Sequence, residues 1–161
     1  MKIALVQMDV AHGKPVENKK HVKEMLERAL DDNPDVIVLS EMWNTGYALD
    51  ELDGLADKEG LDSKELLSHF SRKHAVAIIG GSVAIEKDGK FYNTTYVYNK
   101  SGDLINTYSK VHLFGLMAED QYMSAGSAES VFELDGVTAA SVICYDTVSY
   151  THLRAHETSQ D

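Results

Sequence analysis

Apolar and polar residues are arranged in the first forty positions of the chain in a way that predicts a strand, a helix and a second strand. Two mostly apolar runs, at residues 2–8 and 35–40, have the length and composition of buried strands. Between them, apolar residues recur at the spacing of one helix face: Val22, Met25, Leu26, Ala29 and Leu30. Asn33–Pro34 ends this helix. The order predicts a βαβ unit with a right-handed crossover.

The middle of the chain predicts a second helix followed by several strands. Residues 62–65, DSKE, have the spacing of a capping box, and the apolar positions that follow share one helix face. Residues 75–85 predict a third buried strand, with Gly80–Gly81 marking a bend or a close backbone approach. Asp88–Gly89 predicts a hairpin turn into an alternating strand at residues 91–98, followed by a short strand at 104–108. Residues 110–126 lack a period and predict a long loop with one helical turn.

The stretch from Gly136 to Asp146, GVTAASVICYD, follows a short strand at residues 131–134 and a turn at 135–136. Its small and β-branched residues predict a strand buried on both faces, ending near the only cysteine, Cys144. A thiol at the end of such a strand lies where parallel α/β sheets have their ligand crevices. The alternative for this stretch alone is a buried core cysteine that packs as a small hydrophobe.

Length, charge and cysteine content narrow the class of protein. A chain of 161 residues has room for one domain with a real core. The net charge of −11 argues against phosphate-mediated nucleic-acid binding and against an anionic membrane surface. One cysteine excludes an intramolecular disulfide, which fits a reducing compartment. The apolar run at the N-terminus is too short for a signal peptide or a membrane span, so we expect a cytoplasmic protein.

Three reactive side chains follow predicted strands: Glu41, Lys110 and Cys144. A thiol is only a few per cent thiolate near neutral pH, so fast reaction requires a base or a positive neighbour. A partly desolvated Glu41 could accept the thiol proton, and Lys110 could stabilise a thiolate and an oxyanion. Each residue also has a simpler interpretation. Glu41 could cap the following loop, Lys110 could be a solvated surface charge, and Cys144 could be a core residue. Sequence spacing alone does not show that the three meet.

The segments around these residues resemble a known family. Glu41 in LSEMWNTGY, Lys110 in YSKVHLF and Cys144 in VICYD, in this order, are similar to the Glu, Lys and Cys motifs of the nitrilase (carbon–nitrogen hydrolase) superfamily. The segments KIALVQMD and GGSVA resemble it as well. The resemblance runs from Met1 to about Asp146 and is greatest to amidase branches, including ω-amidase-like enzymes that act on small carboxamides.

This resemblance implies an α-β-β-α sandwich, usually paired with a second subunit to form a homo-oligomer. It also implies that Glu41 takes the proton of Cys144, whose sulfur attacks the carbon of a small amide or nitrile. Lys110 and the backbone N–H of Tyr145 would hold the oxyanion. Glu119, in GLMAEDQY, matches a second glutamate that positions the substrate. The mechanism requires no metal or organic cofactor, and it involves neither nucleic acid nor a membrane.

After Asp146 the sequence departs from the family pattern. The family continues into an Arg-Phe-Pro-Glu-type turn and helix, whereas residues 147–161 read TVSYTHLRAHETSQD. We therefore expect residues 1–146 to form a partial carbon–nitrogen hydrolase domain, somewhat more than half of the whole. Residues 147–161 are predicted to be a disordered or foreign tail. The expectation is an incomplete sandwich, truncated at its C-terminus, that is unstable and poorly active when made alone.

Three alternatives remain open at this point. His152 and His156 lie four residues apart but lack a third metal ligand. Cys144 and His156 could form the dyad of another class of thiol hydrolase, although ordering a polar tail costs conformational entropy. The chain could also be an inactive nitrilase-like fragment that acts only in subunit association.

Overall fold

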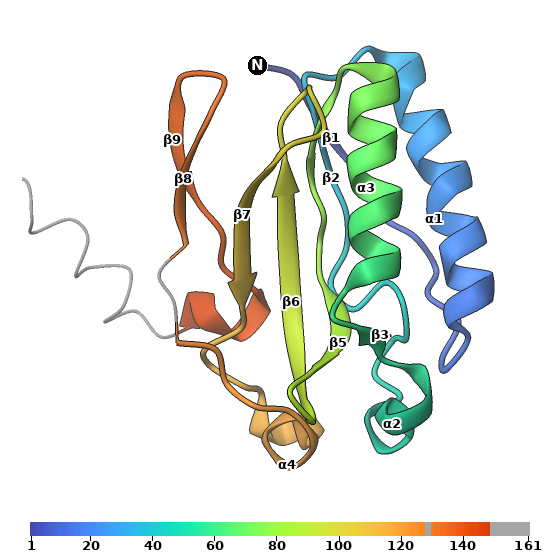
Figure 1. Cartoon of the computed structure of the whole chain (residues 1–161), viewed down its shortest axis with the longest axis vertical. Coiled ribbons are helices and arrows are strands. Elements are labelled where there is room, and N and C mark those ends of the chain that lie inside the picture. Colours follow the sequence, from blue (N-terminus) through green and yellow to red (C-terminus); the bar gives the residue numbers. More distant parts are fainter. Residues whose placement is uncertain (128–129, 149–161) are drawn as a thin grey trace, which may run out of the picture.

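A seven-stranded mixed sheet lies at the centre of the fold, and the computed structural model describes residues 1–127 and 130–148 (Figure 1). The strands are β1 (Ile3–Leu5), β2 (Val36–Val38), β3 (Asp57–Lys58), β4 (Ala77–Ile79), β5 (Val83–Lys87), β6 (Lys90–Tyr98) and β7 (Leu104–Ser109). The hydrogen-bonded order is β1-β2-β4-β6-β5-β3, and β7 also pairs with β6. The strands β1, β2 and β4 are mutually parallel, whereas β6 runs antiparallel to β4, β5 and β7.

Two amphipathic helices, α1 (Pro15–Ala29) and α3 (Leu61–His74), cover one face of this sheet (Figure 1). The predicted βαβ order of the N-terminal region is confirmed, because α1 connects the adjacent parallel strands β1 and β2. The helix begins at Pro15, since a proline in the first turn has no N–H to leave unpaired. Buried side chains of α1, α3 and the sheet form one core cluster, including Val22, Leu26, Leu67, Phe70, Ile37 and Ile78.

The predicted strand at residues 75–85 is divided in two by a bend at Gly80–Gly81. Both halves, β4 and β5, pair with the same edge of β6, and one extra residue in the bend shifts the register between them. A Cβ atom on Gly81 would lie 2.1 Å from the carbonyl oxygen of Ser40. The sequence-based expectation of a bend with close backbone approach is therefore confirmed.

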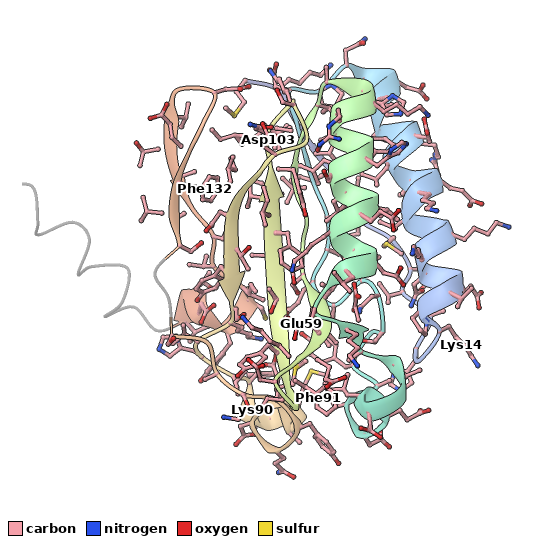
Figure 2. The ribbon with its side chains drawn as sticks, viewed as in Figure 1. Lys14, Glu59, Lys90, Phe91, Asp103 and Phe132 are labelled. Carbon is pink, nitrogen blue, oxygen red and sulfur yellow. The ribbon has the colours of Figure 1, made fainter. Side chains whose placement is uncertain are left out.

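The other face of the sheet is covered in part by a hairpin of β8 (Val131–Leu134) and β9 (Val137–Ala140), which lies beyond β7 in Figure 1. Phe132 points from β8 into the space between the hairpin and the sheet (Figure 2). Phe132 and Leu134 pack there against Val36, Ala77 and Val97. This arrangement gives the described part of the chain the layers helix, sheet and sheet, in agreement with the predicted mixed α/β class.

The expectation that the strand leading to Cys144 is buried on both faces is wrong. Strand β9 ends at Ala140, and its Val137 is 50% exposed. The reason is that β9 pairs only with β8 among the described residues, so one face packs on the sheet and the other meets solvent. Apolar composition alone does not distinguish a strand with two covered faces from a strand with one.

Short helical turns fill the connections between these elements. They are η1 (Leu30–Asp32), η2 (Leu49–Glu51), α2 (Leu52–Leu55), η3 (Gly115–Met117), α4 (Glu119–Tyr122) and η4 (Cys144–Val148). The long loop predicted at residues 110–126 therefore contains two such turns. The expected domain boundary after residue 146 falls within η4, and both His152 and His156 lie outside the described residues.

The capping box predicted at residues 62–65 is wrong. Helix α3 begins at Leu61, so Asp62 already lies in its first turn. The carboxylate of Asp57 accepts the backbone N–H groups of Asp62, at 3.1 Å, and of Ser63, at 2.8 Å. The position of Asp57 depends on the pairing of β3 with β5, which local sequence spacing does not reveal.

We expect Asp57→Ala to lower the free energy of unfolding by about 1 kcal/mol, because two N–H groups at the start of α3 lose their acceptor. Asp62→Ala removes only an exposed ion pair with Lys19 and should change this free energy by less than about 0.5 kcal/mol. Urea unfolding of the two variants measures both values. A larger loss of unfolding free energy in Asp62→Ala than in Asp57→Ala would support the capping box at residues 62–65 instead.

Candidate active site

Lys110, the residue after β7, lies with no solvent exposure between two carboxylates. Its Nζ is 2.9 Å from Oε1 of Glu41 and 2.8 Å from Oε2 of Glu119. Burial lowers the pKa of Lys110, but its hydrogen bonds to Glu119 and Glu41 outweigh this effect, and the pKa is raised. Lys110 is therefore a buried, charged group, and its interpretation as a solvated surface charge is wrong.

The sheet and the loop after β7 bring the three residues together. Glu41 comes just after β2, where the backbone of Ser40 is in close contact with Gly81. The backbone N–H of Lys110 donates to the carbonyl of Asn93 on β6, which continues the pairing of β7. Glu119, in α4, has no exposed surface, and its Oε2 also accepts the backbone N–H of Phe114 at 2.8 Å. Three segments distant in sequence therefore converge on one ammonium group.

Asn93 joins the two carboxylates and was not predicted from the sequence. Its Nδ2 donates to Oε1 of Glu41 at 2.9 Å and to Oε1 of Glu119 at 3.0 Å. The side chain is almost fully buried, and within the described residues its Oδ1 has no hydrogen-bond partner. The available signal was the position of a polar amide in the alternating strand at residues 91–98, where a buried polar group needs partners.

Tyr47, in the loop after Glu41, is a second residue that sequence reasoning missed. The Tyr47 side chain is half-buried, and burial, followed by the charge of and a hydrogen-bonding interaction with Glu41, raises its pKa above the ordinary value. The raised pKa keeps this hydroxyl neutral near Glu41. Its place within the WNTGY segment was the only indication in the sequence.

Cys144 lies in the turn after β9 and is exposed, so its interpretation as a core residue is wrong. Its backbone has a φ of 45°, in the left-handed region that non-glycine residues rarely adopt. Loss of surrounding water and the Glu41 charge raise the pKa of the thiol, while Lys110 lowers it and a hydrogen bond to Glu41 raises it further. The net direction is upward, so the resting thiol is protonated near neutral pH.

A cleft of about 400 Å³ opens beside the thiol. Its lining comes from the ends of β2 and β4, from β6 and from the segment before Cys144, and includes Leu39, Glu41, Gly81, Thr95 and Ser141. The aromatic ring of Tyr145 lies close to that of Phe114, with a centroid separation of 5.1 Å. The structure therefore brings Glu41, Lys110 and Glu119 into contact and places Cys144 beside Glu41.

Two further observations concern the described residues as a whole. Between residues 1 and 148, leaving out 128–129, no three His, Cys, Asp or Glu side chains are grouped so that they could hold a metal ion. The same part of the chain contains no helix with the length and apolar character needed to cross a membrane.

The α/β architecture is that of nitrilase-superfamily hydrolases. The family described as carbon-nitrogen hydrolase matches residues 2–160, and the chain belongs to this family.

Individual relatives agree with this assignment. The chain is 44% identical to the 2-oxoglutaramate amidase of Bacillus subtilis over 156 residues, which are 97% of this chain and 60% of that protein. It is 30% identical to the omega-amidase NIT2 of Danio rerio over 152 residues, covering 90% of this chain and 54% of the relative. The crystal structure of Nit3 from Saccharomyces cerevisiae, from branch 10 of the nitrilase superfamily, superimposes with a TM-score of 0.85 and 25% identity. That comparison covers 98% of this chain and 60% of Nit3. The chain thus spans little more than half the length of the curated relatives it matches.

We expect Glu41→Gln to lower the pKa of Cys144, because the substitution removes the negative charge that disfavours the thiolate. In the unaltered chain, thiolate absorbance at 240 nm should therefore rise with a midpoint above the ordinary value of 9.0. Glu133→Gln, an exposed change on β8, is the matched control and should leave the midpoint unchanged. An unchanged midpoint in Glu41→Gln would show that the two groups do not interact.

Proposed function

We propose that this chain carries the catalytic residues of an amidase that hydrolyses a small carboxamide to an acid and ammonia through a cysteine thioester. The observation that carries the proposal is the buried Lys110 between Glu41 and Glu119, beside the only cysteine. Family membership supports the class of reaction. The relatives named 2-oxoglutaramate amidase and omega-amidase support a short acyl group as substrate.

In the proposed reaction, Glu41 accepts the thiol proton as the sulfur of Cys144 attacks the carbonyl carbon. The resulting oxyanion is held by the ammonium of Lys110 and the backbone N–H of Tyr145. Collapse of this intermediate, with return of the proton from Glu41 to nitrogen, releases ammonia and leaves the thioester. Glu41 then activates one water molecule, whose attack releases the acid and restores the thiol. The balance is amide plus water to acid plus ammonia.

Glu119 acts in this proposal as a positioning residue. Its Oε1 accepts from Asn93 and its Oε2 accepts from Lys110 and the backbone of Phe114, so both oxygens are occupied. We infer that it orients the substrate through Lys110. A fixed ammonium stabilises developing negative charge without reorganising during the reaction.

The remaining expectations are parts of the same proposal. Cytoplasmic location rests on the single cysteine and the absence of a disulfide, and homo-oligomer formation rests on the family resemblance. The catalytic domain is proposed to occupy residues 1–146. A nitrile substrate and a role only in subunit association are the alternatives that the following measurement separates.

We expect the purified protein to release ammonia from 2-oxoglutaramate and to form an acyl adduct on Cys144 that mass spectrometry detects. Cys144→Ala should abolish the adduct, and Lys110→Met should lower kcat/KM by at least about 100-fold, because the oxyanion loses its charged partner. The matched control Lys90→Met changes an exposed lysine at the first position of β6 and should retain full activity (Figure 2).

His156→Ala distinguishes the Cys-His dyad from the Glu-Lys-Cys mechanism. The substitution should abolish turnover if the dyad is used and should leave turnover unchanged in the Glu-Lys-Cys mechanism. A short aliphatic amide and the corresponding nitrile, assayed in parallel, separate amidase from nitrilase activity. Folded protein that forms no adduct with any of the three compounds would contradict the proposed function and favour subunit association.

A further inference from the structure

Asp146 is a buried carboxylate that the proposed reaction does not use. It is 4% exposed and lies two residues after Cys144. Its Oδ2 accepts the hydroxyl of Tyr108 at 2.7 Å and the backbone N–H of Ile143 at 3.0 Å. Its Oδ1 accepts the backbone N–H of His112 at 2.8 Å and lies 3.0 Å from Nδ1 of the same residue. A desolvated carboxylate with this many partners holds their relative positions closely.

The partners of Asp146 belong to the two segments that carry the reactive groups. Tyr108 precedes Lys110 by two residues and His112 follows it by two, so both sides of the buried lysine are held. Ile143 immediately precedes Cys144. One carboxylate therefore connects the backbone around the ammonium to the backbone around the thiol.

The turn at Cys144 requires such support. A positive φ in a non-glycine residue costs of the order of 1–3 kcal/mol and persists only where surrounding contacts maintain it. In addition to the hydrogen bonds of the Asp146 side chain, the backbone N–H of Asp146 donates to the carbonyl of Ile143 at 3.1 Å. The hydroxyl of Thr147 donates to the carbonyl of Cys144 at 2.7 Å. These bonds close η4 around the thiol.

We propose that Asp146 is the positioning residue that holds the Cys144 turn against the Lys110 segment and so places the thiol within hydrogen-bond reach of Glu41. The proposal rests on the proposed function for its effect on turnover, whereas its effect on the thiol is independent of any substrate. Displacement of a reacting atom by about 1 Å can lower a rate by about 100-fold.

Asp146→Asn tests this proposal with little change in volume. Asparagine offers one oxygen and one NH₂ group, so the NH₂ faces either the N–H of Ile143 or the N–H of His112. A buried donor then lacks its acceptor, and the turn should relax. Tyr108→Phe removes one hydroxyl donor and should act in the same direction to a smaller extent.

The measurements are the pH profile of Cys144 alkylation by iodoacetamide and, where turnover is detected, kcat and KM for 2-oxoglutaramate. In Asp146→Asn the alkylation midpoint should move toward the ordinary value of 9.0, since the thiol leaves Glu41. We expect kcat to fall by about 10- to 100-fold with a smaller change in KM. Val97→Ala, a buried change on β6 among the residues that pack against the hairpin, is the control for loss of stability alone and should keep the midpoint.

Folded Asp146→Asn with an unchanged midpoint would overturn the proposal. If Asp146→Asn does not fold, Tyr108→Phe decides, and an unchanged midpoint in that variant overturns it equally. If the alkylation midpoint shifts in Asp146→Asn while the unaltered protein turns over no amide, the positioning role is supported and the proposed function is contradicted. Failure of the positioning role and failure of the proposed function are therefore distinguishable.

Discussion

Lys110 carries a charge at a position without solvent exposure, and the rest of the site is arranged around that charge. Transfer of an ammonium group out of water costs several kcal/mol unless partners compensate, and here two carboxylates do so at 2.9 and 2.8 Å. Loss of one partner of a buried ion pair typically costs about 3–5 kcal/mol. Because the two carboxylates come from distant parts of the sequence, this requirement links the end of β2 to the loop after β7.

Strand β6 provides the frame in which this ion pair forms. One edge of β6 pairs with β4 and β5 and the other with β7, so residues that follow β2 and β7 meet near the middle of β6. Asn93 lies there and donates to both carboxylates. The close approach of Gly81 to Ser40 keeps the segment before Glu41 against the bend between β4 and β5. Sheet pairing and side-chain pairing thus stabilise the same geometry.

The sequence predicted the features that depend on the local hydrophobic pattern and on the chemistry of single residues. The two long helices and the strands of the sheet other than β3 were identifiable, and Glu41, Lys110 and Cys144 were singled out because each follows a predicted strand. Asn93, Tyr47 and the capping role of Asp57 were not, since their partners are set by strand pairing across many residues. The exposed face of β9 was missed for a related reason, because the burial of a strand depends on what packs against it and not on its own composition.

The charges around the thiol also explain how a cysteine with a raised pKa can serve the proposed reaction. Two carboxylates and one ammonium give the group a net charge of about −1, which disfavours a free thiolate. Movement of the proton from Cys144 to Glu41 leaves that net charge unchanged, because a thiolate appears as a carboxylate disappears. Lys110 then has a thiolate nearby in place of one of its carboxylate partners. The thiol remains protonated, and hence protected from oxidation, until its proton passes to Glu41, which lines the same cleft.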